Sequence, residues 1–121
     1  MRKILVVDDV DSVRSNIART LVNEGYEVKE ASNGTECLKY LRESKYDLII
    51  LDIMMPQKGG IDTLVEIKNF KDLKKIIITG MVLPESDAFQ NLVKHYGAKS
   101  ILYKPFKQQQ LLDAINDAFK I

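Results

Sequence analysis

Five polar side chains stand directly after short apolar runs of the sequence, and their chemical types suit the handling of a phosphoryl group. The set comprises Asp8, Asp9, Asp52, Thr79 and Lys104. Clustered carboxylates repel one another and raise each other's pKa unless a cation lies between them. A divalent cation that prefers oxygen ligands, Mg²⁺ (or Mn²⁺), meets that need while keeping several of its waters. A hydroxyl and an ammonium on the far side of such a site can bind the equatorial oxygens of a phosphoryl group.

One carboxylate beside such a cation can itself act as the nucleophile and form an aspartyl phosphate. Asp52 is the candidate, because it ends a run expected to be a central strand and lies between the acidic pair and the lysine and threonine. Taken singly, each of these residues has an ordinary structural explanation. Asp9, for example, is well placed to cap the helix expected after it. The joint placement of all five is much harder to obtain by chance, so we interpret them as one site.

The elements that must position these residues alternate regularly between strand and helix. We expect strands at residues 4–7, 27–31, 48–51, 76–78 and 100–103, and each is followed by an amphipathic helical segment. Strand 27–31 is less apolar than the other strands and is expected near an edge of the sheet. Three of the other strands are apolar at every position, which is typical of strands buried on both faces. Asn33 followed by Glu36 predicts a capping box, and Pro84 predicts a helix start.

Five strand–helix units with right-handed crossovers predict an α/β fold, a three-layer (βα)5 doubly wound parallel sheet with helices on both faces. Ligands of open parallel sheets bind in the crevice at the carboxyl ends of the strands. Because the five polar residues all follow predicted strands, we expect them to converge on that edge of the sheet.

Composition excludes several classes of protein. The chain has 121 residues, enough for one domain, and its 18 basic residues nearly balance its 17 acidic ones. That balance disfavours direct binding of nucleic acid or a membrane surface. The single cysteine, Cys37, cannot form an internal disulfide and fits a reducing compartment. We find neither an export signal nor an apolar stretch of about 20 residues, so we expect a cytoplasmic protein.

Four motifs carry a family resemblance: LVVDD at 5–9, LIILDIMMP at 48–56 with Gly60 beyond it, ITG at 78–80 and YKPF at 103–106. In order and spacing, they resemble the receiver domains of two-component response regulators, the CheY-like family. The resemblance covers residues 1–121 and implies a single receiver domain with a flavodoxin-like sheet of strand order 2-1-3-4-5.

The resemblance implies a role for each site residue. Asp52 resembles the phosphoacceptor that takes a phosphoryl group from a phosphohistidine. Asp8 and Asp9 resemble the acidic pair that holds Mg²⁺, together with Asp52 and the backbone carbonyl of Met54. Thr79 is similar to the switch hydroxyl, and Lys104 is similar to the lysine that contacts phosphate. The bond between this lysine and the following proline, here Pro105, is typically cis in the family. These seven positions form the site expected from the family.

The sequence departs from the family pattern in three respects. Ile101 stands where many receivers carry an aromatic rotamer switch, while Tyr103 directly precedes the lysine, so we expect a smaller aliphatic rearrangement here. Met54 and Met81 flank the expected phosphoryl site, and thioethers position a hydrolytic water poorly, so we expect slow self-hydrolysis. Gly59 stands where an acidic or amide residue is common, which is expected to loosen the loop after the phosphoacceptor.

The function implied is a phosphorylation-dependent signalling switch that catalyses only its own phosphorylation and dephosphorylation. Its expected partners are a sensor histidine kinase or histidine phosphotransfer protein and a downstream effector protein or output domain. Partners would read the face of the fourth helix, fifth strand and last helix, and a phosphorylation-dependent homodimer is possible.

Other functions remain open. An aspartyl-nucleophile phosphatase would use Asp9 with Asp11 two residues later, but the chain is short for that class and Asp52 would have no role. A nucleotide- or flavin-binding domain is disfavoured, because the first strand–helix turn has no glycine and is acidic. A pseudo-receiver that binds partners without phosphorylation is the remaining alternative.

Overall fold

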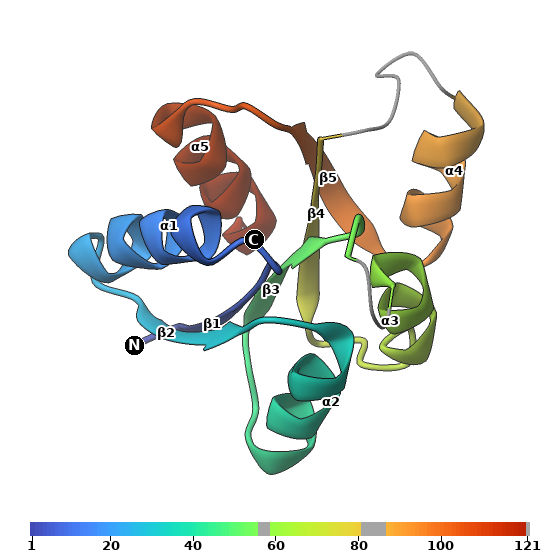
Figure 1. Cartoon of the computed structure of the whole chain (residues 1–121), viewed down its shortest axis with the longest axis horizontal. Helices are drawn as coiled ribbons and strands as arrows, with labels where there is room; N and C mark the ends of the chain where they lie inside the picture. The colour runs from blue at the N-terminus through green and yellow to red at the C-terminus, as the bar shows by residue number, and fades with distance from the viewer. Residues whose placement is uncertain (56–58, 81–86, 121) are drawn as a thin grey trace.

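The computed structural model describes residues 1–55, 59–80 and 87–120. Its five strands form one parallel sheet in the order β2-β1-β3-β4-β5 (Figure 1). Strands and helices alternate along the chain as β1 (Lys3–Val7), α1 (Asp11–Asn23), β2 (Glu27–Ala31), α2 (Gly34–Glu43), β3 (Leu48–Asp52), α3 (Gly60–Glu66), β4 (Lys74–Thr79), α4 (Asp87–His95), β5 (Ala98–Tyr103) and α5 (Gln108–Phe119). The predicted fold class and the strand order implied by the family resemblance are both confirmed.

Helices cover both faces of the sheet: α1 and α5 lie on one face, and α2, α3 and α4 lie on the other (Figure 1). Successive strand residues point to opposite faces. Leu5 and Val7 of β1 therefore pack in the core beneath α2, α3 and α4, while Ile4 and Val6 pack beneath α1 and α5. This alternation decides which face each residue at a strand end will share.

The burial of the strands follows their composition. Every residue of β3 is buried, and so are four of the five residues of β1 and five of the six residues of β4. These three strands are the central ones, whereas the more polar β2 lies at an edge of the sheet, as predicted. Apolar side chains on both faces of a central strand are removed from water by both helical layers, which is why these runs show no polar alternation.

Helix boundaries show where local sequence rules hold and where they do not. Asn33 caps α2 by accepting a hydrogen bond from the Glu36 backbone N–H at 2.9 Å. A complete capping box would also have the Glu36 carboxylate accept from the backbone N–H of Asn33. In the structure that carboxylate instead accepts from both the backbone N–H and the hydroxyl of Ser32. Asp9 is not the cap of α1; Val10 takes that position without a side-chain hydrogen bond.

Two expectations cannot be placed. The helix start at Pro84 and the side chain of Met81 lie outside the described residues. Within the described part of the chain, no helix has both the length and the apolar character needed to span a membrane.

Candidate functional site

Four of the predicted site residues meet the carboxyl edge of the sheet at the ends of four strands. Asp8 follows β1, Asp52 ends β3, Thr79 ends β4 and Lys104 follows β5. Asp8 and Thr79 are completely buried and Asp52 is 2% exposed. Buried carboxylates are uncommon unless they are paired or bind a cation, so this edge is a site rather than a set of turn residues.

Strand alternation places three of these side chains on the same face. Asp8 continues the row of Ile4 and Val6 on the α1 and α5 side, and Asp52 continues the row of Leu48 and Ile50. The Lys104 ammonium donates to Asp8 Oδ2 at 2.8 Å and to Asp52 Oδ2 at 3.3 Å. We expected the lysine to lie across Asp52 from the acidic pair, but the structure shows it bonded to Asp8 as well.

The two buried carboxylates are held in the same way. In each, one oxygen accepts a backbone N–H from two residues later, Val10 for Asp8 and Met54 for Asp52, both at 2.9 Å. The other oxygen in each case faces Lys104. The local turn therefore fixes the orientation of each carboxylate, and only the lysine contact depends on tertiary structure.

Charge in the site is incompletely balanced. Burial raises the pKa of Asp52 and the nearby Asp8 raises it further, while the Met54 N–H and Lys104 act in the opposite direction and do not cancel the rise. Burial disfavours the Lys104 ammonium, but its hydrogen bond to Asp8 and its attraction to both carboxylates outweigh burial and raise its pKa. A further cation at the carboxylates would relieve the repulsion between them.

The residues present fit a divalent metal ion. Asp8, Asp9 and Asp52 each offer one carboxylate oxygen, and these three atoms lie within 4.8 Å of one another. Asp9 is the most solvent-accessible of the three. A set of oxygen ligands that is open to solvent on one side matches the preference of Mg²⁺ for a few carboxylates plus water molecules. For Met54 the structure shows the backbone N–H bound to Asp52, and a role of its carbonyl as a ligand stays a prediction.

Arg14 supports the site and was missed by the sequence reasoning. Its guanidinium donates to the Asp8 backbone carbonyl at 2.8 Å and pairs with Asp11 at 2.7 Å and Glu30 at 3.0 Å. It therefore ties the end of β1 to α1 and to β2. The only sequence signal was the Asp11–Arg14 spacing of three residues on a predicted helix, which is common on solvated helix surfaces.

Thr79 reaches the site through the backbone of β4. Thr79 lies two residues after Ile77 in β4, so the two side chains point to the same face of the sheet, the one covered by α2, α3 and α4. The Thr79 side chain is therefore on the opposite face from Lys104. The Thr79 carbonyl accepts from the Lys104 N–H at 2.8 Å, which extends the β4–β5 pairing by one residue. The Lys104–Pro105 bond is cis, as the family resemblance implied.

The expected switch position lies on the same side as Thr79. Ile101 is partly buried and packs against the core beneath α2, α3 and α4. The Tyr103 hydroxyl is buried without a hydrogen-bond partner among the described residues. Ile101 and Tyr103 line a small hollow of about 190 Å³ together with Gln90 and Lys94 of α4.

A larger groove lies beside Lys104. It has a volume of about 590 Å³ and its lining is mainly apolar, formed by Val13, Asn16, Ile17, Gly80, Lys104, Pro105 and Phe106. The groove thus joins the first turns of α1 to the loop before α5, next to the buried carboxylates.

Comparison with known proteins identifies the family. The model of the response regulator receiver domain matches residues 4–116. The chain is 38% identical to the chemotaxis protein CheY of Bacillus subtilis over 118 residues, which is 94% of each protein. It is 36% identical to the transcriptional regulatory protein CpxR homolog of Haemophilus influenzae, covering 95% of this chain and 49% of that protein.

One relative is much longer than the chain. The CAI-1 autoinducer sensor kinase/phosphatase CqsS of Vibrio cholerae is 36% identical, and the match covers 94% of this chain but only 17% of that protein. The chain thus corresponds to one part of some relatives and to nearly the whole of others.

Solved structures agree with the fold. The chemotaxis protein CheY4 of Vibrio cholerae superimposes with a TM-score of 0.88 at 30% identity, covering 98% of this chain and 99% of that one. The response regulator TrrA of Thermotoga maritima, solved in complex with Mg(2+)-BeF, gives 0.85 at 35% identity, covering 98% and 100%. With its sheet order, its buried acidic edge and these matches, the chain belongs to the receiver domain family of two-component response regulators.

Proposed function

We propose that residues 1–121 form a single receiver domain that is switched by phosphorylation of Asp52. The observation that carries this proposal is the pair of buried carboxylates, Asp8 and Asp52, that share the ammonium of Lys104 at the carboxyl edge of the sheet. Membership of the receiver family supports phosphorylation-dependent signalling in general, and the residue roles below are inferred from the geometry.

The proposed chemistry is a phosphoryl transfer from a phosphohistidine. A carboxylate oxygen of Asp52 attacks the phosphorus atom and forms an O–P bond, while the N–P bond to the imidazole breaks and its electron pair returns to the nitrogen. The Met54 N–H holds the Asp52 carboxylate in a fixed orientation. Positioning of the attacking oxygen is therefore built into the turn after β3.

Asp8, Asp9 and Asp52, with the Met54 carbonyl, would hold Mg²⁺. Bound there, the ion supplies positive charge that offsets the negative charge of the phosphoryl oxygens. Lys104, now paired with both carboxylates, would exchange these contacts for the phosphoryl group, and the Thr79 hydroxyl would turn toward the same oxygens. Because the Thr79 side chain lies on the same face of the sheet as Ile101, its movement would alter the packing of Ile101 and the α4–β5–α5 face.

The proposed partners dock at two separate places. The apolar groove beside Lys104 would receive the phosphodonor, a sensor histidine kinase or a histidine phosphotransfer protein, since it is lined by Lys104, whose ammonium bonds to Asp52. A downstream effector or output domain, or a second copy of the chain, would read the α4–β5–α5 face. We further propose that this exchange takes place in the cytoplasm.

The alternative of an aspartyl phosphatase is weakened by the position of Asp11. In that mechanism Asp11 would act as the second acid beside Asp9. The Asp11 side chain is 85% exposed and pairs with Arg14 at 2.7 Å, outside the buried cluster. No comparable contact favours that reading over phosphorylation of Asp52.

The direct test is incubation with acetyl phosphate with and without Mg²⁺, followed by intact mass measurement. We expect a Mg²⁺-dependent gain of one phosphoryl group that hydroxylamine removes, as for an acyl phosphate. Asp52→Asn should abolish the gain, whereas Asp62→Asn, at an exposed aspartate of α3, should leave it unchanged. An equal gain in Asp52→Asn would refute the assignment, as would the absence of both an adduct and fluoroberyllate binding.

A further inference from the structure

The opposite edge of the sheet carries a second concentration of charge that the phosphorylation site does not use. At the amino ends of β3, β4 and β5, two neighbouring hollows share Lys71 and Leu73 in their lining. Strands of five or six residues separate this edge from Asp52 by roughly 17–20 Å. A partner bound here would therefore not contact Asp52 directly.

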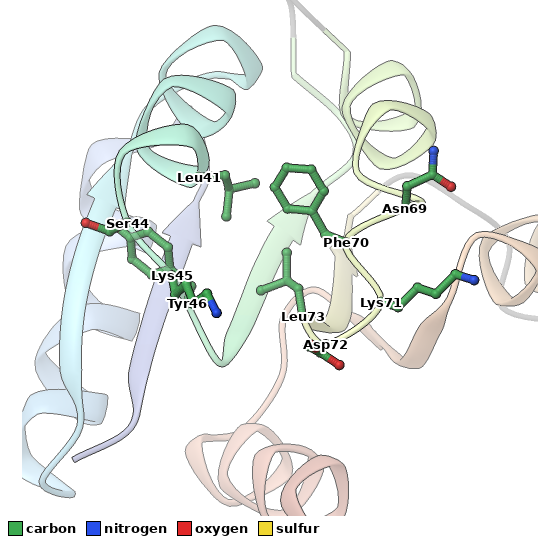
Figure 2. Close-up of a pocket in the computed structure, with 9 residues that line it drawn as sticks. All are labelled: Leu41, Ser44, Lys45, Tyr46, Asn69, Phe70, Lys71, Asp72 and Leu73. Carbon is green, nitrogen blue, oxygen red and sulfur yellow. The ribbon is translucent and has the colours of Figure 1, made fainter.

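The first hollow is apolar at its centre. Figure 2 shows Leu41 at the end of α2 turned toward Phe70 and Leu73 of the loop before β4, with Tyr46 at one side. We call this the Phe70 pocket; its volume is about 340 Å³, enough for one large side chain. Phe70 is 37% exposed, although Leu41 and Leu73 beside it are buried. A half-exposed aromatic over a buried apolar floor is typical of a pocket that takes an anchor side chain.

The second hollow is basic. We call it the lysine pocket; it has a volume of about 270 Å³ and is lined by Lys68, Lys71, Leu73, Lys74, Lys75, Gly97 and Lys99. None of its five lysines forms an ion pair with any carboxylate in the described part of the chain. In a chain of net charge +1, this is a strong local excess of positive charge.

Lys75 makes this excess part of the structure rather than a feature of mobile side chains. It is 3% exposed, and its ammonium donates to the carbonyls of Phe70 at 3.1 Å and Leu73 at 3.2 Å. Burial and repulsion from Lys99 lower its pKa, as expected for a cation without a counter-charge. The same ammonium therefore holds the loop that forms the Phe70 pocket and adds charge to the lysine pocket.

We propose that the Phe70 pocket and the lysine pocket together form a docking site for an acidic peptide segment of a partner protein. An apolar side chain of the segment would enter the Phe70 pocket, and flanking Asp or Glu residues would neutralise the lysines. The adjacent apolar anchor favours a peptide over a nucleic acid. The site meets the α4–β5–α5 face only at Lys99, at the amino end of β5, and it shares no lining residue with the groove beside Lys104.

A random peptide library displayed on phage tests the proposal. It is selected on the full chain and counter-selected on the double variant Lys71→Glu, Lys99→Glu, at two exposed lysines. We expect enriched peptides to carry several acids around one apolar residue. A synthetic copy of an enriched peptide, labelled with fluorescein, should bind the unmodified chain with an affinity that falls as salt is raised.

Matched variants locate the site. The double charge reversal should weaken binding of the synthetic peptide by about tenfold or more, and Phe70→Ala should also weaken it. The control Lys29→Glu, Lys39→Glu reverses two exposed lysines outside both pockets and should bind normally. Labelling of Asp52 by acetyl phosphate should be unchanged in all variants, which shows that the fold is intact and separates this site from the proposed function.

Three outcomes would overturn the proposal. The first is the absence of enriched acidic peptides; the second is equal loss of binding in the control reversal. The third is binding of a single-stranded oligonucleotide at the same lysines more tightly than any selected peptide, which would assign the surface to nucleic acid.

Discussion

The two adjacent glycines at the start of α3, the N-cap Gly59 and the first helical residue Gly60, provide a sharp test of the packing around Asp52. A methyl group added at Gly60 would collide with the backbone of β3, coming within 2.5 Å of the Asp52 carbonyl oxygen and 2.8 Å of the Ile53 carbonyl carbon, with the Ile53 Cα also in contact. At Gly59 the same methyl group would meet only Asp62 Oδ2 at 3.9 Å. Gly59 has φ −63° and ψ 153°, which any residue can adopt.

The expected cost follows from which atoms must move. Overpacking a core costs about 1–3 kcal/mol when side chains can adjust, and more when they cannot. Here the obstacles are backbone atoms, and Ile53 also donates its N–H to the Ile78 carbonyl at 3.2 Å. We therefore expect Gly60→Ala to lower the free energy of unfolding by about 3 kcal/mol or more. Gly59→Ala should stay within about 1 kcal/mol of the unmodified protein.

Urea unfolding followed by far-ultraviolet circular dichroism measures both variants. With a slope of about 1–3 kcal/mol per molar urea, the Gly60→Ala midpoint should fall by about 1 M or more. Its phosphorylation by acetyl phosphate should also slow, because the displaced carbonyl belongs to Asp52. A Gly60→Ala midpoint close to that of the unmodified protein, or equal losses in the two variants, would refute the close approach of α3 to β3.

Two further predictions concern single side chains. Burial raises the pKa of the Cys37 thiol from 9.0 to about 12. As pH rises, the thiol therefore ionises in the unfolded chain before it ionises in the folded one. The stability that the buried neutral thiol contributes is complete below about pH 9 and is lost as pH rises toward 12. Between about pH 8 and about pH 10.5, the stability advantage over Cys37→Ala should therefore shrink by about 2 kcal/mol in urea titrations; an unchanged advantage would contradict a buried neutral thiol. Met54→Asn should shorten the lifetime of phosphorylated Asp52 several-fold, because an amide holds a hydrolytic water better than the half-exposed thioether of Met54. The effect should be smaller than the ~10²-fold acceleration that a general base provides. Intact mass after removal of the donor measures that lifetime, and an equal decay rate would argue against the methionine.

Much of the fold could be predicted because its signals are local. The apolar runs that became β1, β3 and β4 reflect burial on both faces, and the polar β2 reflects its place at an edge. The motifs around Asp8, Asp52 and Lys104 carried the family resemblance, and each follows a strand directly. Local patterns failed where a side chain had a choice of partners, as with Glu36, which accepts from Ser32 instead of completing the capping box.

Amphipathic patterns also overstated burial at the helix surfaces. Val65 and Leu92 are apolar residues of α3 and α4, two of the segments predicted to be amphipathic, yet they are 43% and 41% exposed. Neighbouring positions Leu64 and Val93 are completely buried. The width of the stripe that reaches the core depends on how the helix is rotated against the sheet, which the helical period alone does not specify.

By itself, the sequence determined the alternation of strands and helices, the chemical types at the carboxyl edge and, through its motifs, the family. Tertiary structure alone decided that Lys104 bonds to Asp8, 96 residues away, as well as to Asp52, and that Arg14 ties the end of β1 in place. It also decided which of two adjacent glycines must lack a side chain. Such facts depend on distances between atoms remote in the chain, and the packing of helices against the sheet sets those distances after the local patterns have been satisfied.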